Sequence, residues 1–192
     1  MTRTEPLRVV TLNGGLRSPS STQTLAATIA SAVVEQARVT GVPAAVSTID
    51  VRDHAIDATV ALLDGARSAP LVAALETLTS ADVLVVASPV YNGSYAGPLK
   101  TFTDLLAMEA LAGIPTVLAA TGGSYRHTLA VDQELRPLLG VLQAMAVPTG
   151  VYATAQDWVS PGVPDAALSV RIDRAAWEAV TIAAARDRAP SR

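Results

Sequence analysis

Residues 13–22, with the sequence NGGLRSPSST, combine two glycines, one arginine and four hydroxyl side chains. Glycine lets a backbone turn tightly and approach a ligand without a Cβ clash, and the arginine fork matches the oxygens of a phosphate. A helix that begins here would add free N–H groups. The segment therefore favours a site for a phosphate monoester dianion, with these expected contacts: Gly15, Arg17, Ser20 and Thr22.

The alternative for this segment is an ordinary glycine turn in which Ser20 or Ser21 caps the following helix. A cap needs one hydroxyl and no arginine, so the phosphate interpretation is favoured. The segment is neither a dinucleotide fingerprint nor a Walker A loop, because it contains no G-x-G-x-x-G and no GK[ST].

Residues 88–100, SPVYNGSYAGPLK, hold two of the four tyrosines. An apolar edge followed by amide and hydroxyl groups suits a flat heteroaromatic ring with polar edges. A plain turn before a helix that begins near Pro98 is equally consistent with this stretch. Lys100 is interpreted as a surface side chain, not as a catalytic group. The expected contacts are Pro89, Val90, Tyr91, Asn92, Gly93 and Ser94.

Residues 121–127, TGGSYRH, offer closely spaced backbone N–H donors near the start of another helix. Such donors suit an acceptor that gains negative charge during a reaction, although a glycine-rich turn alone explains this loop better. Arg126 is either a surface residue or a second phosphate contact, and His127 is expected to be structural. The expected contacts are Thr121, Gly122, Gly123 and Ser124.

The elements that must position these segments follow from hydrophobic periodicity. Strands are predicted over residues 7–12, 44–50, 82–88, 114–121 and 148–154. Helices are predicted over residues 20–38, 70–79 and 98–110, then around Leu135 to Leu142 with a bend or restart at Pro137, and from Leu168 onward. Residues 51–67 are richer in polar residues and have no predicted element, and residues 187–192 are expected to be a frayed tail.

Five alternations of strand and helix predict one doubly wound α/β domain over residues 1–192, a three-layer sandwich. The common order for five parallel strands is 2-1-3-4-5, the flavodoxin-like arrangement, with its ligand crevice at the carboxyl ends of the strands. The three loops described above follow adjacent strands in this order and should converge on one pocket. A phosphate, an aromatic ring and an acceptor that becomes anionic together describe FMN, so we expect an FMN site.

Composition excludes several other classes of protein. The chain has no cysteine, which rules out disulfides, iron–sulfur clusters and thiol catalysis, and its two histidines argue against a zinc site. A net charge of −3 without a basic block argues against nucleic acid. No apolar run reaches the roughly 18 residues of a membrane span. We therefore expect a soluble cytoplasmic protein.

With these residues in place, the chain resembles the NADPH-dependent FMN reductases over about residues 7–180. The first loop is similar to the family's phosphate motif at Gly14, Gly15, Arg17, Ser20 and Thr22. The stretch SPVYNGSYAGPLKTFTDLL is similar to a second signature, and ATGGSYRHTLAVDQELRPLL with PTGVYAT to later blocks. Gly15 departs from the pattern, because the family usually has serine there, which removes one hydroxyl but keeps a backbone N–H for the phosphate.

The resemblance implies a reductase that takes hydride from NADPH or NADH, passes it to FMN and releases reduced flavin to a partner monooxygenase. It implies no catalytic side chain, since the cofactors carry the chemistry. It also implies a homodimer or homotetramer. Residues 98–110 and LLGVLQAMAV carry few charges, and we expect them near that interface.

Three other functions fit less well. A flavodoxin-type electron carrier would be markedly acidic, with a threonine-rich phosphate loop that lacks arginine. A quinone or azo reductase would share the fold and FMN but use another acceptor. A serine hydrolase is excluded, because no G-x-S-x-G nucleophile elbow is present.

Overall fold

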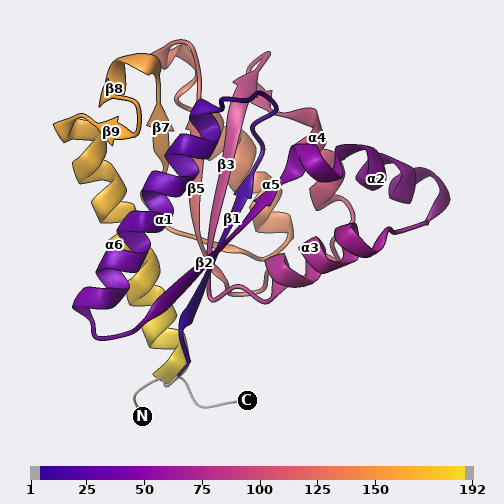
Figure 1. Cartoon of the computed structure of the whole chain (residues 1–192), viewed down its shortest axis with the longest axis horizontal. Coiled ribbons are helices and arrows are strands. Elements are labelled where there is room, and N and C mark those ends of the chain that lie inside the picture. Colours follow the sequence, from indigo (N-terminus) through magenta and orange to yellow (C-terminus); the bar gives the residue numbers. More distant parts are fainter. Residues whose placement is uncertain (1–4, 189–192) are drawn as a thin grey trace.

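A twisted parallel sheet with helices on both faces organises the chain (Figure 1). The computed structural model describes residues 5–188. The main strands are β1 (Leu7–Asn13), β2 (Ala44–Asp50), β3 (Val83–Tyr91), β5 (Pro115–Thr121), β6 (Met145–Ala146) and β7 (Val151–Ala153). Two short hairpin pieces complete the strands, namely β4 (Ser94–Tyr95), which pairs with β3, and the separate pair β8 (Trp158–Ser160) and β9 (Val163–Pro164).

The helices divide between the two faces of the sheet. They are α1 (Ser21–Val39), α2 (Val51–Asp64), α3 (Ala69–Thr79), α4 (Gly97–Thr103), α5 (Arg136–Val141) and α6 (Ala166–Arg188). Helices α1 and α6 cover one face, and α2 to α5 cover the other. Short turns of 3-10 helix occupy Tyr125–His127 and Ala155–Asp157, and a π-helical turn occupies Val131–Leu135.

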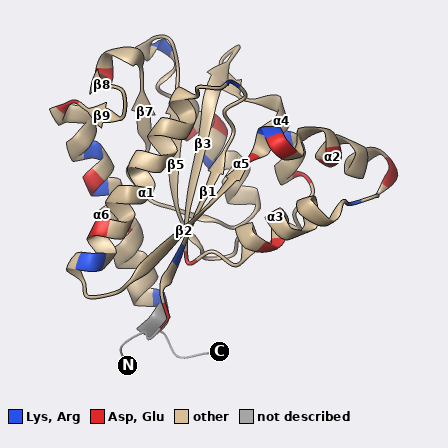
Figure 2. Ribbon diagram, in the orientation of Figure 1, with Lys and Arg blue, Asp and Glu red and all other residues tan. Residues whose placement is uncertain are grey.

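Strict alternation along the strands creates the two cores. In β3, Val83, Val85 and Ala87 face α1 and α6, whereas Leu84 and Val86 face the opposite helices. All five are fully buried, as expected for a parallel sheet covered on both sides. Charged side chains are accordingly found mainly on the outer helices and loops, and the central strands are almost free of them (Figure 2).

The order β2-β1-β3-β5 followed by β6 and β7 confirms the predicted flavodoxin-like topology. The fifth position differs from the prediction, because two short strands replace one strand over residues 148–154. Strand β6 pairs with β5 at Pro115 and Thr116, and β7 pairs with its far end. Pro148 lies between the two pieces, and it has no N–H to donate to the sheet.

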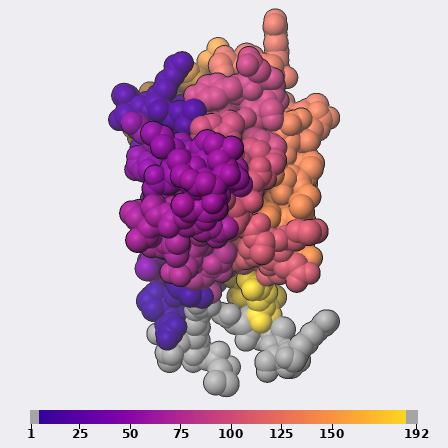
Figure 3. All heavy atoms as spheres, turned by 90° about the vertical axis from the view of Figure 1, so that its right-hand side faces the viewer, coloured from indigo at the N-terminus to yellow at the C-terminus, as the bar shows by residue number. Residues whose placement is uncertain are grey.

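Two helix predictions need correction. Residues 51–67 contain α2, which forms much of the face in Figure 3. The helix predicted over residues 98–110 ends at Thr103 and continues as turns. The predicted restart near Pro137 is confirmed, since the π-helical turn ends where α5 begins. Helix α6 extends to Arg188, so the expected frayed tail at 187–192 begins inside a helix, and residues 189–192 lie outside the described part of the chain.

Candidate functional site

A cavity of about 740 Å³ opens at the carboxyl edge of the sheet. This volume is within the usual range for small-molecule pockets. The cavity is lined by the loop after β1, the end of β3, and the ends of β5 and β7 with the segments that follow them, at the upper edge in Figure 1. Three of these four regions belong to the segments predicted to converge.

The structure brings together most of the predicted contacts, but not all of them. The predicted residues that line the cavity are Gly15, Arg17, Ser20, Thr22, Pro89, Val90, Tyr91, Thr121, Gly122 and Gly123. The predicted residues outside its lining are Asn92, Gly93, Ser94 and Ser124.

Much of the polar chemistry in the first loop is used by the loop itself. The Ser20 hydroxyl caps α1 by accepting a hydrogen bond from the Gln23 N–H at 3.1 Å, which is the capping role considered as the alternative. The Gly15 N–H donates to Asn13 Oδ1 at 3.0 Å. A Cβ at Gly15 would lie 2.2 Å from Ser20 Oγ, so this loop and cap fit together only with glycine there.

Arg17 is the exception in this loop. Its side chain is exposed, lines the cavity and has no hydrogen bond or ion pair to another residue among those described. The first N–H groups of α1, which begins at Ser21, have no acceptor within the helix. A free guanidinium beside a helix N-terminus forms a site for an anion.

Thr22 connects the first and third loops. Its hydroxyl lies 2.6 Å from the Thr121 hydroxyl, and the two side chains are 2% and 6% exposed. This bridge links the first turn of α1 to the end of β5 across the sheet. The Thr22 hydroxyl therefore has a structural partner besides any ligand.

The second loop is a tight hairpin between β3 and β4. Asn92 and Gly93 have φ angles of 51° and 88°, which fits the Asn-Gly turn that a two-residue hairpin favours. The Ser94 hydroxyl donates to Glu134 Oε2 at 2.8 Å, in the neighbouring π-helical turn. The tip of the hairpin is thereby held outside the lining, while Pro89, Val90 and Tyr91 remain at the cavity.

The third loop is anchored to β7. The Gly122 N–H donates to the Ala153 carbonyl at 3.1 Å, so one of the donors expected to face a ligand belongs to the sheet. The Tyr152 hydroxyl donates to the Ser124 carbonyl at 2.8 Å, and burial raises the pKa of this tyrosine. A Cβ on Gly122 would lie 2.0 Å from the Tyr152 oxygen, which explains glycine at this position.

A fourth wall, formed by the segment after β7, was not predicted. Its lining residues include Thr154, Trp158, Ser160 and Gly162. Thr154 and Asp157 form a capping box, with the Asp157 carboxylate accepting from the Thr154 N–H at 2.6 Å. The capping-box spacing and one of the chain's two tryptophans just past the last predicted strand were the available signals.

Asp157 also ties this wall to the third loop, because the Tyr125 hydroxyl donates to it. Burial raises the pKa of Asp157, but hydrogen bonds from Tyr125 and Thr154 outweigh that effect and hold the pKa below its usual value. The same hydrogen bond is the main cause that raises the pKa of Tyr125. Both groups therefore keep their neutral-pH forms and act as structural links.

The chemistry available in this cavity is that of binding. Within residues 5–188, no cluster of three or more His, Asp or Glu side chains is arranged to hold a metal ion. No single described helix is long and apolar enough to cross a membrane, although α2 and α3 together, bent by 97°, pass by length and composition. An arginine, a helix N-terminus, an apolar edge and glycine backbone fit a phosphorylated aromatic cofactor that brings its own reactivity.

Comparisons with known proteins agree with this fit. The family model described as NADPH-dependent FMN reductase matches residues 7–159. An FMN reductase (NADPH) of Pseudomonas aeruginosa is 39% identical over 93% of this chain and 94% of its own. The NADH-dependent FMN reductase SfnF of Pseudomonas fluorescens is 40% identical over 92% of each chain.

A solved structure of an oxidoreductase from Corynebacterium diphtheriae superimposes with a TM-score of 0.89 at 37% identity, covering 95% of this chain and 99% of that one. The chain belongs to the NADPH-dependent FMN reductase family. It is an NAD(P)H:FMN oxidoreductase with the flavodoxin-like fold, and the electron-carrier and quinone-reductase alternatives are not favoured.

Proposed function

We propose that this chain reduces FMN with hydride from NADPH or NADH and releases the reduced flavin to a separate flavin-dependent monooxygenase. FMN, when bound, supplies a ring that accepts hydride and passes electrons on. The observation that carries the proposal is the exposed, unpaired Arg17 beside the N-terminus of α1, within a cavity that also has an apolar edge.

Each part of the cavity has one task in this proposal. Arg17 and the first turn of α1 hold the phosphate, while Pro89, Val90 and Tyr91 lie along the ring. Gly123 allows close backbone approach at the far side. The proposal assigns no side chain as acid or base, and the chain's contribution is to hold and orient two substrates.

Release of flavin is supported by the groups of the phosphate loop that already have partners within the protein. The Ser20 hydroxyl and the Gly15 N–H already have partners in the loop, and the Thr22 hydroxyl bonds to Thr121. Arg17 therefore supplies most of the charge-assisted binding. A phosphate held this way exchanges more readily than one enclosed by many donors.

The test is to mix the protein with NADPH and free FMN and to follow the nicotinamide absorbance band. Consumption of NADPH should depend on FMN concentration, and reduced FMN should transfer to a flavin-dependent monooxygenase in a coupled assay. A rate no higher than that of the uncatalysed mixture, at saturating FMN, would contradict the proposal and favour an electron carrier.

We also propose that the protein works as a homodimer or homotetramer in the cytoplasm, where both substrates are made. Helix α4 does not support this as predicted, because Leu99 and Phe102 are buried in the chain's own core. The support comes from α2, where Ile56, Val60 and Leu63 are exposed at helical spacing. Ile56 and Val60 also line an apolar groove against α4, and Leu63 lies one turn beyond it on the same helix.

Light scattering at micromolar concentration should give a multiple of the monomer mass of 19.7 kDa. Leu63→Glu, at a side chain that is 83% exposed, should shift that mass toward the monomer. Leu129→Glu is the matched control, since Leu129 is also exposed but lies in the loop after β5. A monomeric wild-type protein would refute the proposal.

A further inference from the structure

The loop after β5 carries a cationic side chain, Arg126, that the proposed FMN contacts do not include. Arg126 lies in the 3-10 turn Tyr125–His127, just past Gly123, which lines the cavity. The Arg126 side chain is exposed and does not itself line the cavity. It has no hydrogen bond or ion pair to another described residue.

Free cationic side chains are uncommon among the residues whose side chains the structure describes. Most described Lys and Arg side chains have an acidic or carbonyl partner, as Arg8 has Asp82 at 3.0 Å. Among residues 5–186, those without a described partner are Arg17, Arg126 and Arg186. Arg186 lies near Gly113, which precedes β5, and so belongs to the opposite edge of the sheet. Both remaining free arginines are at the edge that holds the cavity.

The carboxylates of this edge leave both guanidinium groups available to a ligand. Asp157 accepts from Tyr125 and Thr154, Glu134 accepts from Ser94, and Asp50 accepts from Asn13. None of these carboxylates forms an ion pair with Arg17 or Arg126 within the described residues.

The backbone just before Arg126 is held by two hydrogen bonds. The carbonyl of Ser124 accepts a hydrogen bond from the Tyr152 hydroxyl at 2.8 Å, and the Tyr125 hydroxyl donates to Asp157. A charged group on a preorganised turn loses less conformational entropy when a ligand binds. The turn that carries Arg126 is thus ordered, three residues beyond Gly123, which lines the cavity.

FMN has a single phosphate, which the proposed function assigns to Arg17 and α1, whereas the second substrate carries phosphates of its own. We propose that Arg126 binds a phosphate of the pyridine dinucleotide and so sets the affinity for the hydride donor. This inference rests on the proposed function. The phosphate is either the pyrophosphate, common to NADH and NADPH, or the 2′-phosphate of NADPH.

The experiment compares Arg126→Ala, Arg126→Lys and Arg38→Ala with the wild type. Arg38 is a matched control, because it is an exposed arginine at the far end of α1. Dissociation constants for NADPH and NADH are measured by nicotinamide fluorescence anisotropy on the full chain without flavin. KM values for both donors and the dissociation constant for FMN are measured alongside.

Arg126→Ala should weaken NADPH binding and raise its KM by about 10-fold or more, as expected for the loss of a charge-assisted hydrogen bond. Arg126→Lys should lose less, and FMN affinity should change less than about 2-fold. An effect on NADPH alone assigns the 2′-phosphate, and an equal effect on NADH assigns the pyrophosphate.

Two results would overturn the inference: unchanged affinity for both donors, or an equal loss of FMN affinity. The proposed function fails separately. If wild-type protein consumes no NADPH with FMN, yet Arg126→Ala weakens dinucleotide binding, the reductase proposal falls and the role of Arg126 stands.

Discussion

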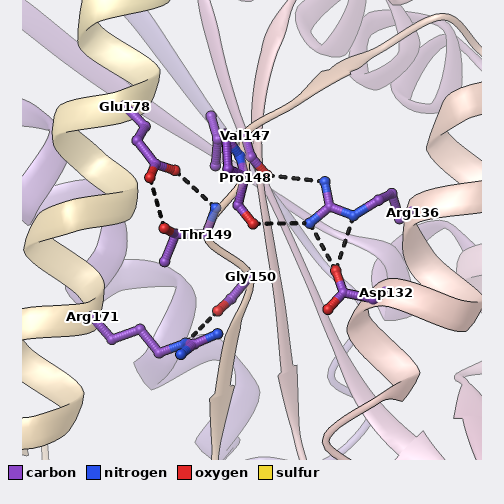
Figure 4. Close-up of polar contacts among 8 residues, drawn as sticks. All are labelled: Asp132, Arg136, Val147, Pro148, Thr149, Gly150, Arg171 and Glu178. Atoms are coloured by element: carbon purple, nitrogen blue, oxygen red, sulfur yellow. Dashed lines mark hydrogen bonds and ion pairs between the residues drawn. The ribbon is translucent and has the colours of Figure 1, made fainter.

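Two connecting segments, residues 147–150 between β6 and β7 and the loop 13–20 after β1, use polar groups in opposite ways. In the first, neighbouring helices supply partners for three carbonyl groups and for both the N–H and the hydroxyl of Thr149 (Figure 4). Glu178 of α6 accepts from the Thr149 N–H at 2.8 Å and from its hydroxyl at 2.7 Å. Arg136 donates to the Val147 carbonyl at 3.0 Å, and Arg171 to the Gly150 carbonyl at 2.5 Å.

The loop 13–20 also bonds to itself, through Asn13, Gly15 and Ser20, but it leaves its one full charge on Arg17 without a partner. The difference separates a structural arginine from a binding arginine. Where helices supply acceptors, an arginine stabilises the fold. Where the acceptor has to come from outside, the arginine marks a ligand site, and its loss should affect binding more than stability.

The largest expected effect is on stability, in the segment 147–150. Glu178→Ala leaves the buried N–H and hydroxyl of Thr149 without an acceptor, so the free energy of unfolding should fall by about 3 kcal/mol. In a chain of this size that lowers Tm by roughly 6–12 °C. Calorimetry measures the shift.

Arg174→Ala is the control for Glu178, since Arg174 binds the same carboxylate from an exposed position. Arg174→Ala should lower the free energy of unfolding by less than about 0.5 kcal/mol. Equal losses in the two variants would show that the ion pair, not the bond to Thr149, stabilises this segment.

The next largest effect is on FMN binding, in the loop 13–20. Arg17→Ala should weaken FMN affinity by about 10- to 150-fold, equivalent to roughly 1.5–3 kcal/mol. Unfolding free energy should barely change. Riboflavin, which has no phosphate, should lose less affinity, and flavin fluorescence titrations measure both. An equal loss for the two flavins would mean that Arg17 supports the loop instead of the phosphate.

A smaller effect tests the internal fit of the same loop. Gly15→Ala places a Cβ where Ser20 Oγ lies, so the hydroxyl must rotate and the cap of α1 weakens. We expect a loss of about 1–2 kcal/mol in urea unfolding. In a Ser20→Ala background the same change should cost less than about 0.5 kcal/mol. Additive losses would contradict the proposed clash.

The smallest effect is the pH dependence that Glu178 confers. Burial raises the pKa of Glu178, but hydrogen bonds from Thr149 and Arg174 outweigh it and hold the pKa below the ordinary 4.5. A lowered pKa contributes stability above the unfolded value and loses it as pH falls through the folded value. Unfolding free energy should therefore fall more steeply below about pH 4.5 in wild type than in Glu178→Gln. Parallel curves would contradict this assignment.

Sequence patterns predicted β1, β3 and β5 because most of their residues are buried on both faces, and β2 was predicted correctly although most of its residues are exposed. Hydrophobic periodicity failed for α2. In α2 the large apolar residues Ile56 and Leu63 are 79% and 83% exposed, while small alanines such as Ala58 face the core. Its hydrophobic pattern therefore does not mark the buried face. The helix expected over residues 98–110 ends early even though Leu105 is buried, because a turn can bury leucine as well as a helix does.

The candidate site also has features that the sequence predicted and features that it could not predict. The glycines and Arg17 predicted a ligand site in the first loop, because a plain turn does not need an arginine together with two glycines. The capping role of Ser20 was one of the two interpretations that the sequence allowed, but the partners of Thr22 and Ser94 are distant along the chain, so sequence could not show that these two hydroxyls already have partners. The wall from Thr154 to Gly162 joins the cavity through the hairpin β8–β9, a contact that no local pattern encodes.

The carbonyl groups bound by Arg136 and Arg171 lie at one edge of the sheet. This edge is formed by the short strands β6 and β7, which pair with β5 on one side only. Exposed strand borders attract strands from other molecules and seed fibres. Here the carbonyls of Val147 and Gly150 are occupied, and Pro148 offers no N–H. By occupying these carbonyl groups, Arg136 and Arg171 leave fewer acceptors at this edge for a strand from another molecule. In the described part of the chain, the seven-residue β2 forms the other border, and it is there that strand addition has an unbroken template.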